Sequence, residues 1–479
     1  MSEQAFISCI VRHLKRLFFF LGCIVATNVY AFNFTIDPAI SVSETFTDNV
    51  NLSSDGFKDD EFILSLNPGL TISSDSRIHD STFNYILQKV HFLNLERTDT
   101  FNSLNSDGEF EFLKDRFFTE YNIRNGQQNV SNTGALATDN LSINNNRQNV
   151  FSYQVHPYWI QRFGTFAFLE LGFDFNEIIS DNNDSTSELI DIKLDHGTLF
   201  NRILWDVDFS DETIDSESGP RTEFRNITAN VRYLLTRKFA LIASIGYDDN
   251  KFQSSDDISG ELWNAGAEWN PSRRTSLSAA VGERFFGTDF RLNASHRTKK
   301  ARFEITFDQT PETTRQNLLD QQVFNLSDIF GDTIIDPVTG QPATLDVLVP
   351  QQSNEVLINR QFRLLASYDY RKTFVSVEFF MTERDFQLTG DTEDNYGTRV
   401  NWRWDLSPTL NSETVFDYNV QDSRQGISSD DIRLSVNVTK NLSRDLDING
   451  GLSHRIRQSD SGGNEFDETR AFIGLTRNF

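Results

Sequence analysis

The stretch DIRLSVNVTKNLSRDLDINGGLSHRI, residues 431–456, decides the fold class of this chain. Its first half places Ile432, Leu434 and Val436 at alternate positions, and polar side chains such as Arg433 fill the positions between them. The second half repeats the same alternation. Successive side chains of a β-strand point to opposite faces of its sheet, so period two with one polar face predicts two half-buried strands.

The same alternation recurs along most of the chain, as in 225–233 and 373–384, and we find no long stretch with helical spacing. Tight turns such as Arg237-Lys238 and Arg371-Lys372 alternate with longer polar joints. The longer joints are expected at 48–59, 94–106, 126–147, 177–186, 211–221, 250–259, 311–360, 385–395, 422–430 and 457–466. Short turns at one end and long loops at the other are typical of outer-membrane barrels.

Counting the segments gives one strand near 34–47, ten hairpins and a last strand at 467–479. The prediction is therefore an all-β chain: a transmembrane, antiparallel, up-and-down β-barrel of about 22 strands, within a range of about 16 to 22. A soluble sandwich would hide its second face between two sheets. Here charged residues recur on one face of the strands. Charged side chains need contact with water, so this face is expected to line a water-filled lumen. The candidate lumen-lining residues are Arg363, Asp369, Glu378, Arg384, Arg433 and Asp447.

The composition excludes other classes of protein. The chain has 479 residues, of which 38% are hydrophobic, and a net charge of −25 from 69 acidic and 44 basic residues. Helical membrane spans need about 20 consecutive apolar residues each, which argues against a polytopic helical protein. Binding to nucleic acid needs clusters of Lys and Arg, so we expect no nucleic-acid partner.

Residues 1–31 have the pattern of a secretory signal peptide. A basic segment ending at Arg16 precedes the apolar run Leu17–Val29, and Val29 and Ala31 supply the small residues of a cleavage site. We therefore expect export by the general secretory route and a single barrel domain over 32–479. Both cysteines, Cys9 and Cys23, lie in the signal, which leaves no disulfide framework in the mature chain.

The chain ends AFIGLTRNF, a strand-like segment with the terminal aromatic residue Phe479. This ending resembles the C-terminal signal that the barrel-assembly machinery reads, although Arg477 stands where an apolar residue is usual. We expect a cell outer membrane location in a Gram-negative bacterium. The expected partners are outer-membrane lipid and lipopolysaccharide and the barrel-assembly machinery.

Three nearby motifs carry a family resemblance: LWNAGAEWNPSRRTSL at 262–277, GERFFG at 282–287 and SHRT at 295–298. They resemble the PEP-CTERM system-associated β-barrel family, outer-membrane proteins found beside exopolysaccharide loci in Gram-negative bacteria. The resemblance implies a role in exopolysaccharide export or surface assembly, with a polysaccharide and periplasmic export components as further partners. It carries over no functional residues.

The sequence offers no catalytic constellation, and we expect neither an enzyme nor a cofactor or metal centre. No two histidines have the spacing of a zinc pair, and Ser453 and His454 fall on opposite faces of their strand. Carboxylates cluster in some longer joints, as at Asp59 and Asp60. Such clusters bind Ca²⁺ in some proteins, but solubility and protection of strand ends explain them more simply.

The joint 311–360 is the longest, and it contains four prolines and short apolar stretches. Loops of this length are usually functional or disordered. Our hypothesis is that it folds over or into the lumen as a constriction; the alternative is a surface loop. The function we expect is a porin-like conduit for an exopolysaccharide. The alternative is a structural anchor or adhesin that displays acidic loops.

Overall fold

The computed structural model describes residues 34–130, 134–181, 183–217, 219–254, 258–315, 355–424, 426–460 and 464–479. The expected signal peptide at 1–31 lies outside these ranges, as do the central residues of the joint 311–360. In the described ranges no helix has the length and apolar character needed to cross a membrane.

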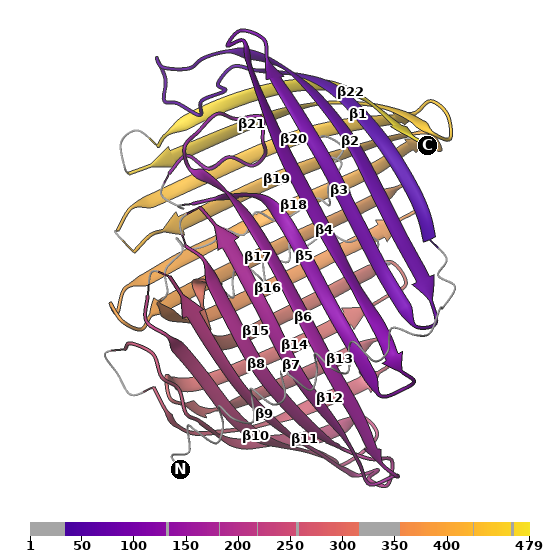
Figure 1. Cartoon of the computed structure of the whole chain (residues 1–479), viewed down its shortest axis with the longest axis vertical. Helices are drawn as coiled ribbons and strands as arrows, with labels where there is room; N and C mark the ends of the chain where they lie inside the picture. Colours follow the sequence, from indigo (N-terminus) through magenta and orange to yellow (C-terminus); the bar gives the residue numbers. More distant parts are fainter. Residues whose placement is uncertain are drawn as a thin grey trace.

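Twenty-two antiparallel strands close into one barrel (Figure 1). Each strand pairs with the next in sequence, and the last returns to the first, so that Thr47 lies opposite Arg470. The strands are β1 Phe34–Thr47, β2 Glu61–Ser76, β3 His79–Phe92, β4 Arg97–Leu113, β5 Phe117–Asn129, β6 Arg147–Phe163, β7 Ala167–Ser180, β8 Ser185–His196, β9 Ile203–Ser216, β10 Thr222–Leu234, β11 Phe239–Asp248, β12 Gly260–Ser272, β13 Thr275–Arg284, β14 Gly287–Arg297, β15 Ala301–Thr313, β16 Val356–Tyr370, β17 Thr373–Phe386, β18 Thr392–Ser407, β19 Leu410–Asp422, β20 Ser428–Asn441, β21 Leu446–Ser459 and β22 Phe466–Asn478. The prediction of an all-β, up-and-down barrel of about 22 strands is confirmed.

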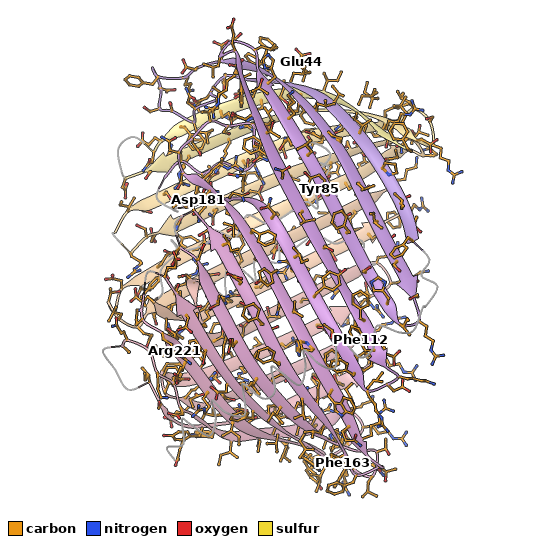
Figure 2. The ribbon with its side chains drawn as sticks, viewed as in Figure 1. Glu44, Tyr85, Phe112, Phe163, Asp181 and Arg221 are labelled. Carbon is orange, nitrogen blue, oxygen red and sulfur yellow. The ribbon has the colours of Figure 1, made fainter. Side chains whose placement is uncertain are left out.

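The two ends of the barrel differ in the length of their connections. We call the end where β1 begins and β22 ends the turn end; its joints include 273–274, 298–300 and 371–372. The opposite end, the loop end, carries the joints 130–146 and 314–355 among others. In Figure 2, Phe163 lies at the turn end, and Asp181 and Arg221 lie at the loop end. In bacterial barrels the short turns are periplasmic and the long loops extracellular.

Several strands are longer than the sequence indicates. The expected joint 94–106 is wrong, because β4 begins at Arg97 and only 93–96 remain outside strands. The joint 311–360 contracts in the same way to 314–355. Strands of a large barrel continue beyond the apolar zone, where both faces meet polar surroundings, so their ends have the composition of loops.

The two faces of the wall invert the pattern of a soluble protein. Leu434 and Leu452 point outward with 47% and 61% of their surface exposed. Charged side chains such as Arg399 and Arg455 point inward and are buried. An exposed apolar band around a polar interior is the arrangement that a lipid bilayer requires of a barrel.

Buried apolar side chains gather in two small clusters. The larger consists of Val50, Ile63, Val90 and Phe92, together with Leu141 from the joint between β5 and β6. The smaller consists of Leu52, Ala137 and Phe466. Both clusters combine residues of the wall or its loop-end joints with residues of a single loop.

The motif block at 262–298 forms β12, β13 and β14. Asn264 on β12 lies opposite Gly282 on β13. A Cβ atom at Gly282 would lie 1.8 Å from the carbonyl oxygen of Trp263, so only glycine lets the two strands approach this closely.

Candidate functional site

Charged side chains form a row across six neighbouring strands of the inner wall. Successive members lie directly opposite one another in the strand registers. This charge row consists of Glu378 on β17, Arg399 on β18, Asp417 on β19, Arg433 on β20, Arg455 on β21 and Glu468 on β22. Its three positive and three negative members balance, so the row is polar without a net charge.

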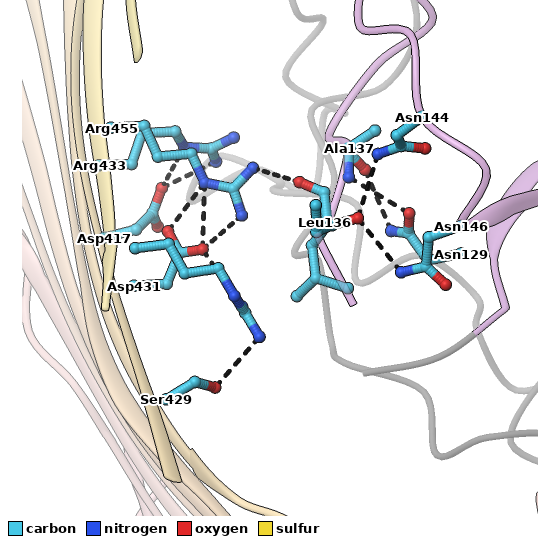
Figure 3. Close-up of polar contacts among 12 residues, drawn as sticks. Asn129, Leu136, Ala137, Asn144, Asn146, Asp417, Ser429, Asp431, Arg433 and Arg455 are labelled. Atoms are coloured by element: carbon cyan, nitrogen blue, oxygen red, sulfur yellow. Dashed lines mark hydrogen bonds and ion pairs between the residues drawn. The ribbon is translucent and has the colours of Figure 1, made fainter. Parts of the chain in front are cut away.

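Ion pairs join three members of the charge row, Arg399, Asp417 and Arg433, to one another. Arg455 pairs instead with Asp431 on β20, which lies outside the row (Figure 3). Arg433 donates from Nε and Nη2 to Oδ2 of Asp417, at 2.9 and 2.8 Å, and Arg399 donates to the other oxygen of Asp417. Arg455 donates from Nε to both oxygens of Asp431, at 2.9 and 3.1 Å. Each cross-strand pair of opposite charge contributes about 0.2–1 kcal/mol to the stability of the sheet. Arg399 and Arg433 share the partner Asp417, which fixes the three side chains in place.

The joint between β5 and β6 folds inward and lies against this wall. We call residues 134–146 the docked loop. Arg455 donates from Nη1 to the carbonyl oxygen of Leu136 at 2.6 Å. Arg470 donates to Oδ2 of Asp139 at 2.5 Å and to Oγ of Ser142 at 2.6 Å. The loop therefore interacts with β21 and β22, far from it in sequence.

Asparagine side chains give the docked loop its internal shape (Figure 3). The carbonyl oxygen of Ala135 accepts hydrogen bonds from the side chains of Asn144 and Asn146, at 3.1 and 3.2 Å. Asn129, at the end of β5, donates to the carbonyl oxygen of Ala137 and accepts from its backbone N–H. Asn side chains replace backbone partners in this way where regular structure is absent.

Apolar contacts add to these polar ones. Leu141 is 3% exposed and enters the cluster around Ile63 and Phe92, and Ile143 packs against that cluster. Burial of one such side chain stabilises a structure by about 1.5–3 kcal/mol relative to exposure. The docked loop is thus held by a small core of its own in addition to its ion pair.

The surroundings of Asp139 favour the ionised form of its carboxyl group. Burial opposes its ionisation, but the charges of Arg470 and Arg147 and the backbone N–H of Leu141 outweigh burial and hold the pKa of Asp139 below its ordinary value. Asp139 is therefore ionised at neutral pH and pairs with Arg470.

A cavity of about 120 Å³ lies between the docked loop and the wall. Leu136 and Ala137 bound it on the loop side, and Arg363, Glu378 and Arg433 bound it on the wall side. Apolar, amide and charged groups line this cavity, whose volume is large enough for only a few water molecules. The docked loop narrows the lumen at this level. The charge row lies on the other side of the cavity from the loop.

A second segment reaches inward from another part of the barrel. Arg315 lies two positions after the end of β15. It donates to Oγ of Ser185 at 2.7 Å and to the carbonyl oxygen of Asn176 at 3.1 Å. Ser185 and Asn176 belong to β8 and β7, which do not neighbour β15. Arg315 is 5% exposed, and burial lowers its pKa to about 10, so it stays charged at neutral pH.

The structure brings three of the six candidate lumen-lining residues together. Arg363 pairs with Glu378, and both line the cavity with Arg433. Arg384 lies nearer the loop end, where it pairs with Glu393 at 2.6 Å.

The remaining two candidates, Asp369 and Asp447, lie near the turn end, next to the joints 371–372 and 442–445. They share the inward positions of their strands but lie apart from the charge row. Phe479 also lies at the turn end, where its backbone N–H donates to Pro38 of β1 at 2.9 Å.

Sequence reasoning missed the docked loop and four of the six members of the charge row, namely Arg399, Asp417, Arg455 and Glu468. The sequence predicts 126–147 only as one of the longer polar joints, although Leu136, Leu141 and Ile143 interrupt its run of Asn and Ser. Those apolar residues were the available signal, because an exposed loop has no use for them. Arg399, Asp417 and Arg455 carry no signal until the strand registers place them side by side.

The described part of the chain holds no group of three or more His, Cys, Asp or Glu side chains placed to bind a metal ion. His454 donates to or accepts from Oγ1 of Thr469 at 3.0 Å and is exposed, whereas the adjacent Ser453 faces the other way. The arrangement of the lumen can bind and orient polar groups by hydrogen bonds and ion pairs.

The chain matches no protein-family model and no curated protein. Solved structures with a similar barrel include the siderophore receptor PirA from Acinetobacter baumannii, with 8% identity over 94% of this chain and 81% of that one and a TM-score of 0.54. The FrpB iron transporter from Neisseria meningitidis, F3-3 variant, has 10% identity over 92% of this chain and 81% of that one, with a TM-score of 0.52. At these identities the likeness shows a shared fold, that of an outer-membrane β-barrel.

Proposed function

We propose that this protein is a porin-like conduit of the outer membrane that passes an exopolysaccharide. The observation that carries the proposal is the docked loop, which narrows a polar lumen against a charge row of balanced sign. The resemblance at 262–298 to PEP-CTERM system-associated barrels supports a polysaccharide as the cargo.

The lumen chemistry fits a hydroxyl-rich polymer. A sugar chain leaving water must exchange its hydrogen bonds for others, since an unsatisfied polar group costs about 1–3 kcal/mol. The wall around Arg399, Asp417 and Arg433 supplies donors and acceptors side by side, and the docked loop adds amide groups from Asn129 and its neighbours. Passage needs no covalent chemistry, only a lumen that replaces water without binding too tightly.

The test is single-channel conductance of the refolded mature barrel in planar bilayers, with neutral and acidic polysaccharides added to either side. We expect ohmic current that a polysaccharide of the cargo class blocks reversibly. Silence from a barrel whose heat-modifiable gel mobility shows that it is folded would contradict the conduit.

A second candidate function is a structural anchor that displays acidic loops. The observation that favours it is the buried ion pair that holds the docked loop in the lumen. The side chains of Asp139 and Arg470 in this pair are only 14% and 10% exposed. An anchor would stay silent in the bilayer experiment even after the docked loop is loosened. Current that is present in the wild type and increases when Asp139 is replaced would instead support the conduit.

A further inference from the structure

A hollow of about 750 Å³ opens at the turn end, among the joints that connect β10 to β15. Five basic residues line it: Arg237, Lys238, Arg273, Arg274 and Arg297. We call these five residues the basic basin. Their concentration is unusual in a chain whose net charge is −25.

The charges of the basic basin are not neutralised by neighbours in the described structure. Arg302 also lines the hollow, but Glu304 accepts its Nε–H at 2.9 Å. None of the five basin residues forms such a pair with a described residue, and all five are exposed. Unpaired cations that share one hollow repel each other, so an anion placed between them relieves a cost that is already present.

The hollow lies on the rim of the barrel, and most of its strand residues take inward positions. Trp269 and Phe303 point outward and are 50% and 48% exposed, in the direction of lipid. Arg297 on β14 lies opposite Arg302 on β15, one position from the outward pair His296 and Phe303, so both arginines take inward positions. Thr275 and His296 line the same hollow from outward positions, so the hollow spans the rim of the turn end. Its inward strand residues face the mouth of the lumen, where a soluble polymer arrives.

The rest of the molecule polarises the field along the barrel axis. Carboxylates accumulate at the loop end, in the joints that contain Asp55, Asp59 and Asp60 and at Asp249 and Asp391. An anion that approaches from the turn end meets cations first, and one that approaches from the loop end meets carboxylates. Clefts lined by one sign of charge raise the local concentration of the opposite ion.

Resting on the proposed conduit function, we propose that the basic basin is the entry site for an anionic glycan, a polysaccharide that carries carboxylate groups. Guanidinium groups bind carboxylates through two parallel N–H···O bonds, and Arg supplies four of the five basin cations. Asn270, Ser276 and Ser295 line the same hollow and offer partners for sugar hydroxyls. The basin gathers the polymer, and the charge row with the docked loop forms the passage beyond it.

The test measures binding of a hexamer of galacturonic acid to the folded, detergent-solubilised barrel by calorimetry, which needs no open pore. The variant removes three basin charges: Arg273→Gln, Arg274→Gln and Arg297→Gln. The matched control removes three exposed charges from other turns of the same end: Arg77→Gln, Lys114→Gln and Arg116→Gln. A neutral maltohexaose serves as the uncharged probe.

We expect the wild type to bind the galacturonate hexamer and not maltohexaose, and to lose affinity as salt rises. The basin variant should bind about tenfold more weakly, since three exposed charge pairs are lost, and the control should change less than about twofold. Equal losses in both variants would overturn the proposal, because they would show a diffuse effect of the whole rim.

Three further outcomes separate the basin from the conduit. No binding to the wild type overturns the entry site whatever the bilayer experiment shows. Binding to dispersed phosphatidylglycerol but not to the hexamer also overturns it, because it assigns the basin to lipid. Basin-dependent binding by a barrel that conducts no current upholds the site and contradicts only the conduit.

Discussion

Arg455 and Leu136 are 319 positions apart, and the guanidinium of Arg455 donates to the carbonyl oxygen of Leu136 at 2.6 Å. The same side chain binds Asp431 and stands in the charge row beside Arg433. One residue thus joins the inner wall to the loop that narrows the lumen. A change in the loop is expected to alter the lumen without altering the barrel.

Replacing Asp139 with Asn should release the docked loop. The change leaves Arg470 without one of its two carboxylate partners, and breaking a buried ion pair from one side costs about 3–5 kcal/mol. We expect larger and noisier single-channel currents, with unchanged heat-modifiable gel mobility. Asp55→Asn, which removes an exposed partner of Lys58, is the control and should leave the current unchanged. Identical currents in both variants would show that the loop does not narrow the passage.

Acid should release the same loop. The pKa of Asp139 is held below its ordinary value, so its pairing with Arg470 contributes fully above the unfolded pKa of about 3.9 and is lost as pH falls through the lower folded pKa. Conductance should therefore be insensitive to this group between about pH 7 and 5 and should rise only in stronger acid. The Asp139→Asn variant should lack this acid step, and an acid step of equal size in that variant would assign it to another group.

Leu141→Ala should weaken the docking of the loop through packing. The substitution leaves a void among Ile63, Val90 and Phe92, and large-to-small changes in such clusters cost about 2–5 kcal/mol. Limited proteolysis should cut within 134–146 faster than in the wild type. Leu452→Ala removes the same atoms from an outward position that is 61% exposed and should leave the cleavage rate unchanged.

Asp417→Asn should shift the ion selectivity of the pore toward anions. Asp417 balances Arg399 and Arg433, so its neutralisation leaves two positive charges facing the docked loop. The reversal potential in a salt gradient measures the shift. Asp369→Asn removes an equal charge near the turn end, away from the narrowing, and should shift the potential less.

Arg315→Gln should detach the start of the joint 314–355 from β7 and β8. The shorter side chain cannot reach both Ser185 and the carbonyl oxygen of Asn176. We expect faster hydrogen exchange at the loop-end residues of these strands and a change in current. Arg221→Gln, an exposed change on the same end, is the control. Unchanged exchange in the Arg315 variant would show that the contact does not hold the segment.

The barrel could be predicted because its evidence is local. Alternation such as Ile432, Arg433, Leu434 records which side of the wall each residue faces, and the tight turns at Arg237-Lys238 and Arg371-Lys372 record where one strand ends. The same local evidence failed at 94–106, since a strand that leaves the apolar zone loses its apolar face and resembles a loop.

The candidate site could be predicted only in part. Glu378 and Arg433 were recognisable as inward charges from alternation alone, because polar side chains on one face of a strand need water or a partner. Which charges meet depends on the strand registers, and those set Arg399 opposite Asp417 and Asp417 opposite Arg433.

By itself the sequence determined the barrel, its strand number and the direction of its faces, since these follow from the order of polar and apolar residues along each strand. Only the tertiary structure decided that residues 134–146 lie inside the lumen and that Arg315 reaches β7 and β8. The contact of Arg455 with Leu136 joins segments that are hundreds of positions apart in the sequence. The contact of Arg315 with Ser185 joins strands that are not neighbours in the barrel. Their energy comes from partners such as Arg455 and Arg470, which are brought within reach only after the first and last strands have paired.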